Sequence, residues 1–387
     1  MSEKNSIYFN KPHMTGKELF YIAEAHFNGQ LSGDGPFTKK CHKLLESSLD
    51  SKKALLTHSC TAALEMAAIL LDLEPGDEII MPSYTFVSTA NAFVLRGAIP
   101  VFIDIRPDTL NIDEALIEDA ITSRTRAIVV VHYAGISCDM DAIVNIAKKH
   151  DLYIVEDAAQ ALESKYKDKF LGTIGDIGAI SFHETKNIIS GEGGAILVNN
   201  NSFVERSEII REKGTNRSQF IRGEVDKYTW RDIGSSYLPG ELIAAFLWAQ
   251  LENSFDITSS RVRIWKKYFE LFHNLESDGI VKRPFVPDYC THNAHLFYLI
   301  LPDEDIRNSV IGILKDAGVH CLFHYLPLHS SPAGRKFTRF HGSMHHTDNM
   351  STRILRIPLW YGMSDNEIER VFKLVDFAVR HESSRRK

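Results

Sequence analysis

Seven short apolar runs constrain the fold of this chain more than any other feature. They show no polar alternation, as is typical of strands in a sheet that is covered on both faces. Helical patterns lie between several of them, at residues 61–73, 88–95, 113–121 and 139–150. Such alternation predicts a mostly parallel sheet whose ligands bind at the carboxyl ends of the strands. The predicted strands are residues 54–57, 78–81, 101–104, 126–132, 153–156, 178–182 and 195–198.

The pattern changes near residue 204, after which helices predominate. At 387 residues the chain is also longer than one ordinary core accommodates. We therefore expect two domains: residues 1–255, a large α/β domain with an N-terminal helical segment, and residues 256–387, a smaller α+β domain. The elements expected after residue 203 are helices at 203–213, 241–251, 258–275, 305–317 and 365–379, and strands at 296–301 and 320–324.

Composition excludes several classes of protein. The net charge of −6 gives no basic surface for nucleic acid. No run approaches the roughly 18 apolar residues of a membrane span, and the polar N-terminus has no signal-peptide pattern. The five cysteines are odd in number and contain no C-x-x-C pair, which favours reduced thiols. We expect a cytoplasmic protein with no metal site, no membrane contact and no nucleic-acid partner.

Polar residues follow the first predicted strand, where a helix begins. Ser59, Cys60 and Thr61 occupy this position. Free backbone N–H groups at a helix N-terminus, with hydroxyl groups beside them, suit a phosphate. The alternative is a simple helix cap, and the two interpretations are compatible.

Two adjacent acids, Glu156 and Asp157, end a fully apolar strand. Neighbouring strand residues point to opposite faces, so one acid at most can face a given site. A buried carboxylate needs a partner, and a protonated ring nitrogen would be one. The alternative is a structural acid that caps the next helix.

Lys186 lies between two apolar strands, flanked by hydroxyl groups and glycines. A lysine whose pKa is depressed is nucleophilic and can form a Schiff base. Tyr84 and Phe86 end another strand and can stack on a planar ring. The alternatives are a solvated surface lysine and aromatic residues that pack in the core. A site for pyridoxal 5′-phosphate needs a phosphate-binding turn, an acid, an aromatic residue and a lysine, and the sequence offers all four.

The motifs PSYTF at 82–86, EDAAQ at 156–160, SFHETK at 181–186 and GEGG at 191–194 carry a specific resemblance. With them the chain resembles the DegT/DnrJ/EryC1/StrS family of sugar aminotransferases over nearly its whole length. The resemblance implies a fold type I PLP-dependent transferase, similar to aspartate aminotransferase, with pyridoxal 5′-phosphate as cofactor. It also implies that Lys186 forms the Schiff base, that Asp157 pairs with the pyridine nitrogen, and that Gln160 contacts the ring hydroxyl. Phe86 would stack on the ring, and Ser181 would hold the phosphate together with residues 59–61.

The resemblance also implies the reaction. Residues 81–93, 181–187 and 211–217 are most similar to members that aminate a dTDP-linked 4-keto-6-deoxy sugar. We therefore expect transfer from L-glutamate to C4 of dTDP-4-dehydro-6-deoxy-D-glucose, giving dTDP-4-amino-4,6-dideoxy-D-galactose for cell-surface polysaccharide. Related dehydratases have His in place of this lysine, so Lys186 favours transamination. A homodimer with shared sites is implied as well. The expected substrate contacts are His183, His324 and Tyr325.

Several alternatives stay open at this point. The product could be a 4-amino-gluco or a 3-amino sugar instead. The family's G-x-N-x-R run, which reaches into the partner's site, corresponds here to residues 234–238, where Ser236 replaces Asn. The glycines at 172, 175 and 178 suggest a nicotinamide-dependent oxidoreductase, although their spacing and position are unlike the dinucleotide fingerprint. A catalytically silent sensor that binds the cofactor is a third hypothesis. Nucleotide contacts are expected among Arg211, Lys213, Arg217, Lys227 and Arg231.

Overall fold

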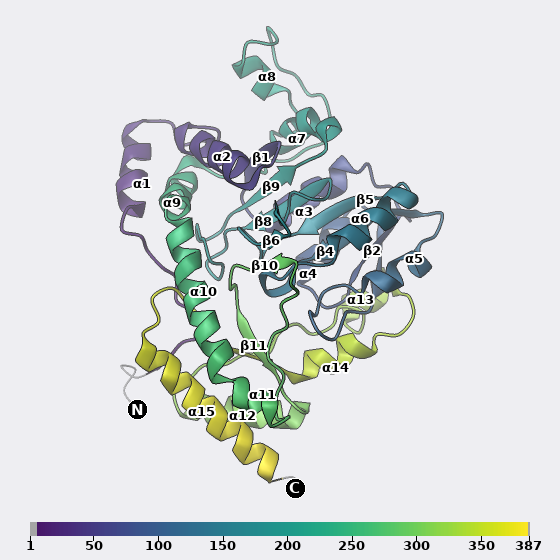
Figure 1. Ribbon diagram of the computed structural model, residues 1–387. Helices are drawn as coiled ribbons and strands as arrows, with labels where there is room; N and C mark the ends of the chain where they lie inside the picture. Colours follow the sequence, from purple (N-terminus) through teal and green to yellow (C-terminus); the bar gives the residue numbers. More distant parts are fainter. Residues whose placement is uncertain (1–5, 386–387) are drawn as a thin grey trace.

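An eight-stranded sheet lies at the centre of the computed structural model, which describes residues 6–385 (Figure 1). Its strand order is β1-β9-β8-β5-β4-β2-β3-β12. Neighbouring strands pair in parallel except at β9, which is antiparallel to both β1 and β8. The predicted mostly parallel sheet is confirmed. Its strands are β1 (Lys53–Thr57), β2 (Glu78–Pro82), β3 (Ile99–Ile103), β4 (Thr125–Val131), β5 (Tyr153–Asp157), β8 (Ile177–Ser181), β9 (Gly194–Val198) and β12 (Arg339–Phe340).

Both faces of the sheet are buried, because side chains along each strand alternate between two cores. On β1, Leu56 belongs to one core and Leu55 to the other; Ile80 and Ile79 divide in the same way on β2. Helices α2, α6 and α9 cover the first face, and α3, α4 and α7 cover the second. Their bounds are α2 (Pro36–Leu49), α3 (Cys60–Leu70), α4 (Val87–Val94), α6 (Met140–Lys149), α7 (Val204–Arg211) and α9 (Glu241–Leu251).

A third core fills the C-terminal part of the chain, around the two-stranded sheet of β11 and β13. Helix α10 connects it to the first core, because Ile257 packs in the first core and Ile264 in the third. We therefore keep residue 255 as the proposed domain boundary. Ile7 also packs in the third core, so the N-terminal segment crosses to it. The elements here are α10 (Ser254–Leu271), α11 (His273–Ser277), α12 (Glu304–Asp316), α15 (Asp365–Ser384), β11 (Phe297–Ile300) and β13 (Ile354–Ile357).

The remaining elements are short or peripheral. Helix α1 packs against α9, and the segment that contains α8 projects from the body of the molecule (Figure 1). Within residues 6–385, no helix combines the length and the apolar character needed to cross a membrane. These elements are α1 (Glu18–Phe27), α5 (Ile117–Ala120), α8 (Arg217–Ile221), α13 (Pro332–Phe337), α14 (His345–Arg353), β6 (Lys165–Tyr166), β7 (Lys169–Phe170) and β10 (Cys290–Thr291), with 3₁₀ turns at Glu114–Leu116, Tyr133–Gly135 and Asn201–Phe203.

The seven strands predicted before residue 204 are all present, and their ends differ by at most two residues. The strand predicted at 320–324 is wrong. There the His320 N–H donates to the Ile7 carbonyl (2.9 Å), whereas the Leu322 N–H donates to the Arg356 carbonyl (3.1 Å). The segment changes partner after two residues, so it forms isolated bridges instead of a strand. The prediction also missed α2. It expected one helix at residues 113–121, where the structure has a 3₁₀ turn followed by the single turn α5.

Candidate active site

Three strands end at the same edge of the sheet. Thr57, at the end of β1, and Ser181, at the end of β8, both pair with Gly194, the first residue of β9. Asp157, at the end of β5, pairs with Ala179 of β8. Because β9 is antiparallel to its neighbours, its start lies beside their ends. The topology thus brings together the three segments that the sequence singles out.

A cavity of about 790 Å³ opens at this edge and is also lined by the C-terminal part of the chain. Its size is within the range of about 300–1,000 Å³ that is typical of small-molecule sites. Every residue predicted to contact the cofactor or the sugar contributes to its wall, while the chemical role of each stays a prediction. These residues are Ser59, Cys60, Thr61, Phe86, Asp157, Gln160, Ser181, His183, Lys186, His324 and Tyr325.

The start of α3 forms one end of the cavity. Ser59 is the N-cap residue, and its hydroxyl accepts a hydrogen bond from the Ala62 N–H (3.1 Å). The first N–H groups of a helix lack intrahelical acceptors and attract anions. Gly194 allows β9 to pass directly beneath them, since a Cβ there would lie 2.5 Å from the Cys60 nitrogen. With the Ser181 hydroxyl beside it, this end of the cavity suits a phosphate.

Asp157 faces the cavity from the end of β5 and is 6% exposed. Its Oδ2 accepts a hydrogen bond from the Thr89 hydroxyl (2.6 Å), and its Oδ1 accepts one from the Ala159 N–H (3.1 Å). Thr89 is held in turn by the Thr85 hydroxyl (2.8 Å). These bonds fix the orientation of the carboxylate. The acid can therefore serve as a fixed partner for a cationic group.

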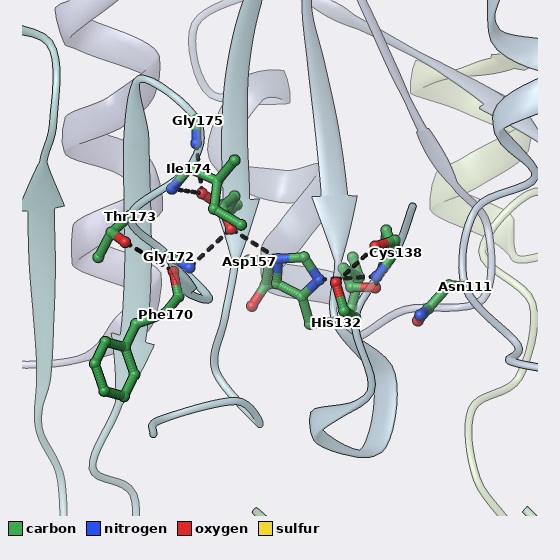
Figure 2. Close-up of polar contacts among 12 residues, drawn as sticks. Asn111, His132, Cys138, Asp157, Phe170, Gly172, Thr173, Ile174 and Gly175 are labelled. Carbon is green, nitrogen blue, oxygen red and sulfur yellow. Dashed lines mark hydrogen bonds and ion pairs between the residues drawn. The ribbon is translucent and has the colours of Figure 1, made fainter. Parts of the chain in front are cut away.

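Glu156 points to the opposite face, as the alternation of a strand requires. It is fully buried and accepts hydrogen bonds from the Gly172, Ile174 and Gly175 N–H groups (2.7, 2.7 and 2.6 Å). His132 Nε2 lies 2.9 Å from its Oε2. Figure 2 shows the three backbone groups on one side and His132 on the other. Glu156 therefore has a structural role.

The same hydrogen bonds argue against the oxidoreductase hypothesis, which depends on the glycines at 172, 175 and 178. Gly172 and Gly175 donate to Glu156, and the segment leads into β8 rather than into a helix. In a dinucleotide site, such glycines would open a helix and bind a pyrophosphate.

We predict that Glu156→Gln lowers the free energy of unfolding by about 3 kcal/mol, because hydrogen bonds to a charged group contribute about 1.5–3 kcal/mol each and the amide cannot accept all of them. Urea titration measures the change. Glu369→Gln, at an exposed position, is the matched control, with an expected change within about 0.5 kcal/mol. Equal effects of the two substitutions would contradict the structural role.

Lys186 follows β8 in a loop, and its half-buried side chain lines the wall of the cavity. Burial lowers the pKa of the Lys186 ammonium, and the positive charge of Arg356 lowers it further, whereas Cys60 and Asp157 oppose this shift. Within residues 6–385, no carboxylate lies within ion-pairing distance of the Lys186 nitrogen. At a given pH, a larger fraction of this lysine is therefore in the uncharged, nucleophilic form than of an ordinary lysine.

The lowered pKa predicts a pH profile in the cofactor-free protein. Only the neutral amine attacks, so the reaction of Lys186 with trinitrobenzenesulfonate should rise with pH through the lowered pKa and level off above it. That plateau should begin at a lower pH than the plateau of ordinary exposed lysines in the same digest. Peptide mass spectrometry of timed samples measures both rates. Identical profiles would contradict the effect of burial.

Aromatic and polar side chains form the opposite wall. The Gln160 Oε1 accepts a hydrogen bond from the Ala134 N–H (2.7 Å), and its Nε2 donates to the Tyr325 hydroxyl (2.9 Å). His324 stacks on Tyr325, with ring centroids 3.5 Å apart, and burial holds the pKa of the His324 imidazole well below its usual value. Phe86 is 56% exposed and lies 6.4 Å from the Tyr325 ring. An open Phe86 face is available for stacking.

His183 lies at a more open part of the wall. Its Nδ1 is 2.9 Å from the Thr185 hydroxyl, and its Nε2 is 3.6 Å from a Glu192 oxygen. The side chain is 40% exposed, so a ligand in the cavity can reach it.

The basic segment predicted to bind the nucleotide is not part of this cavity. Arg211 is buried and pairs with Asp34 (2.8 Å), and Lys213 and Arg217 both pair with Glu212. Ser236 forms a backbone bridge with Glu212. These residues lie at the base of the projecting segment, outside the cavity wall.

Sequence reasoning missed two arginines in the wall, Arg261 on α10 and Arg356 on β13. Arg356 was visible as a charge in the apolar stretch Ile354-Leu355-Arg356-Ile357, whereas Arg261 lies among polar and charged residues that gave no signal. His295 is a third addition, and its Nδ1 lies 3.1 Å from the Asn187 amide oxygen.

The residues of the cavity fit pyridoxal 5′-phosphate. The cavity has a helix N-terminus that suits a phosphate, an oriented carboxylate that suits a protonated ring nitrogen, and a half-buried lysine that has no carboxylate in ion-pairing distance within residues 6–385. An amine of this kind beside an anion site is the arrangement that a carbonyl cofactor requires. Fold and site together define a fold type I PLP-dependent aminotransferase.

Comparison with known proteins gives the family. Residues 12–376 match the model of the DegT/DnrJ/EryC1/StrS aminotransferase family, so the chain belongs to this family. It is 36% identical to uncharacterized protein MJ1066 of Methanocaldococcus jannaschii, over 88% of this chain and 89% of that protein. It is 34% identical to the spore coat polysaccharide biosynthesis protein SpsC of Bacillus subtilis, over 95% of each.

A solved structure agrees with this assignment. The putative sugar aminotransferase Spr1654 of Streptococcus pneumoniae, in its PMP form, superposes with a TM-score of 0.91 at 25% identity, covering 99% of this chain and all of that one. The same protein has also been solved in a PLP form. The predicted family, fold, class of enzyme and cofactor are confirmed.

Proposed function

We propose that this enzyme transfers the amino group of L-glutamate to C4 of dTDP-4-dehydro-6-deoxy-D-glucose, giving dTDP-4-amino-4,6-dideoxy-D-galactose. The observation that carries the proposal is the convergence of Lys186, Asp157 and the start of α3 on one cavity. The cavity is large enough for an amino acid or a sugar beside the cofactor. The naming of SpsC for polysaccharide biosynthesis supports a product destined for cell-surface polysaccharide.

In this proposal each side chain has a distinct task toward the cofactor. Ser59, Cys60, Thr61 and Ser181 hold the phosphate through hydroxyl groups and the first N–H groups of α3. Asp157, oriented by Thr89, would keep the ring nitrogen protonated. Gln160 would contact the ring hydroxyl, and Phe86 would stack on the ring.

When bound, pyridoxal phosphate supplies an electron sink for the carbon that loses a proton. Lys186 would hold it through the side-chain amine and, when that amine is free, would move a proton at the reacting substrate carbon. The lowered pKa of Lys186 leaves its amine free to accept that proton.

The sugar occupies the side of the cavity formed by His183, His324 and Tyr325. Tyr133 lies 2.9 Å from His324 Nδ1, and Gln160 donates to Tyr325, so the rings of His324 and Tyr325 are held in place. Fixed donors and acceptors of this kind suit a polyhydroxylated ring.

We also infer a cytoplasmic homodimer. The projecting segment exposes several aromatic side chains, Phe220, Tyr228 and Trp230, of which Trp230 is 80% exposed. Exposed aromatics that cluster on one element favour contact with another chain. A second copy would bury them, and it would bring Ser236 and the basic residues of this segment toward the partner's nucleotide.

The visible absorption spectrum tests the proposal. The holoenzyme should show a band of the bound aldehyde that disappears on addition of glutamate and returns on addition of dTDP-4-dehydro-6-deoxy-D-glucose. A band that glutamate removes, but that only a 3-keto sugar restores, would replace the proposal with 3-amination. A protein that stays colourless with added pyridoxal phosphate would contradict the role of Lys186.

A further inference from the structure

Tyr133 is fully buried, and its hydroxyl lies 2.9 Å from the Nδ1 atom of His324. Its backbone N–H donates to the side-chain oxygen of Asn111 (2.9 Å). The next residue, Ala134, has a φ of 59°, in the left-handed region that is costly for a residue other than glycine. Such strained turns cluster at functional sites, where the surrounding structure holds a side chain in a set place. The turn therefore fixes the Tyr133 hydroxyl beside the His324 ring.

The distances around Tyr133 determine where its hydroxyl hydrogen lies. The Tyr84 hydroxyl is 2.9 Å from the His324 carbonyl and 3.4 Å from the Tyr133 oxygen, so its single hydrogen goes to the carbonyl. For Tyr133, the bond to His324 Nδ1 at 2.9 Å is better than the contact with Tyr84 at 3.4 Å. Burial raises the pKa of Tyr133 well above its usual value, so the hydroxyl keeps its hydrogen. Tyr133 therefore donates to Nδ1.

This hydrogen bond selects one tautomer of His324. Burial holds the pKa of His324 well below its usual value, so the ring is neutral and carries a single hydrogen. Because Nδ1 accepts from Tyr133, that hydrogen is on Nε2. Within residues 6–385, no protein group is hydrogen-bonded to Nε2. His324 lines the cavity, so its Nε2–H is a fixed donor that a ligand can use.

The keto group of the proposed sugar substrate fits this donor. A carbonyl oxygen only accepts hydrogen bonds, whereas a hydroxyl group both donates and accepts. The reacting carbon must lie beside Lys186, because Lys186 is proposed to move a proton there. His324 lines the same cavity, and the positive charge of Lys186 contributes to the lowering of the His324 pKa, so the two side chains are neighbours. A carbonyl oxygen gains negative charge when its carbon is attacked, and a preorganised donor stabilises that charge.

We propose that Tyr133 is a positioning residue that holds His324 as the Nε2–H tautomer, and that this N–H donates to the keto oxygen of the sugar nucleotide. The inference rests on the proposed transaminase function and names the group that recognises the reacting carbonyl of its second substrate. Hydrogen bonds in a chain polarise one another, so the bond from Tyr133 strengthens the donor at Nε2.

Kinetics of single and double variants of the holoenzyme test the proposal. Tyr133→Phe removes only the hydroxyl and should lower kcat/KM for the keto sugar about 10-fold, the effect of one hydrogen bond. In His324→Gln the side-chain amide is itself a donor and needs no tautomer, so adding Tyr133→Phe to that variant should change kcat/KM by less than about twofold. Tyr298→Phe is the matched control. The Tyr298 hydroxyl is buried without a hydrogen-bond partner among residues 6–385, and its ring is 5.9 Å from that of Tyr133, so this variant should behave like wild type.

Nitrogen-15 NMR of the histidine-labelled holoenzyme provides a readout that a merely structural role would not change. The signals that disappear in His324→Gln belong to His324, and in wild type they should show a hydrogen on Nε2 and none on Nδ1. Tyr133→Phe should show both tautomers. A hydrogen on Nδ1 in wild type would overturn the proposal. Where His324→Gln has no measurable rate, the tautomer decides.

The kinetic outcomes separate this inference from the proposed function. Unchanged kcat/KM in Tyr133→Phe, or an equal loss from Tyr133→Phe with His324 and with Gln at that position, would overturn the inference. An equal loss together with a lower melting temperature would make Tyr133 structural, and the inference also fails. Each of these results with an active wild type refutes this inference alone, whereas a wild type that is inactive on the keto sugar refutes the proposed function.

Discussion

Replacing Lys186 with alanine should lower the rate of amino transfer at least about 10³-fold. The lysine is proposed both to hold the cofactor and to move the proton, and general acid–base catalysis alone contributes about 10²–10⁴-fold. The side chain lines the cavity and has no ion pair to lose within the described residues. The fold should therefore persist, and single-turnover kinetics with glutamate should reveal the loss.

Two controls accompany this variant. Lys169→Ala, at an exposed position on β7, should keep full activity. Added methylamine should restore part of the rate of Lys186→Ala, because a free amine can enter the vacated space and accept the proton. Full activity of Lys186→Ala would contradict the assignment. A loss that is matched by a lower melting temperature and is not rescued would indicate damage to the fold instead.

Replacing Asp157 with asparagine should lower the rate by about 100-fold or more. Removing one partner of a buried charged pair costs about 2–5 kcal/mol, and each 1.4 kcal/mol is tenfold. Asparagine fills the same space and keeps one oxygen for Thr89, but it cannot stabilise a protonated ring nitrogen. Steady-state kinetics with saturating glutamate measures the change.

Thr89→Val separates the charge of Asp157 from its orientation. The threonine touches the carboxylate at 2.6 Å, so its loss should loosen Asp157 and lower the rate by roughly tenfold, the effect of about one charged hydrogen bond. If Asp157→Asn is less harmful than Thr89→Val, the carboxylate charge is not what the site uses.

The strands were predictable because both of their faces are buried. Continuous apolar runs such as 127–131 permit few alternatives to a covered strand. The sequence pattern also indicates helix α2, because apolar residues recur every four positions. These residues are Phe37, Cys41, Leu45 and Leu49, and all are buried. Pro36 at its first turn is a further start signal. The prediction missed it although the pattern was present.

The conformation of residues 320–324 could not be predicted from the local sequence. Its apolar composition favours a strand, but its backbone partners are Ile7 and Arg356, which lie far away in sequence. Whether a short apolar segment forms a ladder depends on the partner that the tertiary structure offers.

The site was only partly accessible from sequence. Alternation along β5 predicts that Glu156 and Asp157 face apart, but the resemblance to the family was needed to choose between them. The hydrogen bonds of Glu156 to the 172–175 turn supply the physical reason for that choice. Arg356 looks like the exposed position of a strand, and its place in the cavity follows from how the C-terminal part packs.

Transfer of labelled nitrogen tests the central claim most directly. The holoenzyme is incubated with ¹⁵N-glutamate and dTDP-4-dehydro-6-deoxy-D-glucose, and the sugar nucleotide is analysed by mass spectrometry and NMR. The account predicts one ¹⁵N atom per product molecule, bonded to C4 in the axial, galacto orientation, with 2-oxoglutarate formed in equal amount. Recovery of the keto sugar without ¹⁵N would contradict amino transfer to this substrate, and nitrogen at C3 or in the equatorial orientation would contradict the proposed product.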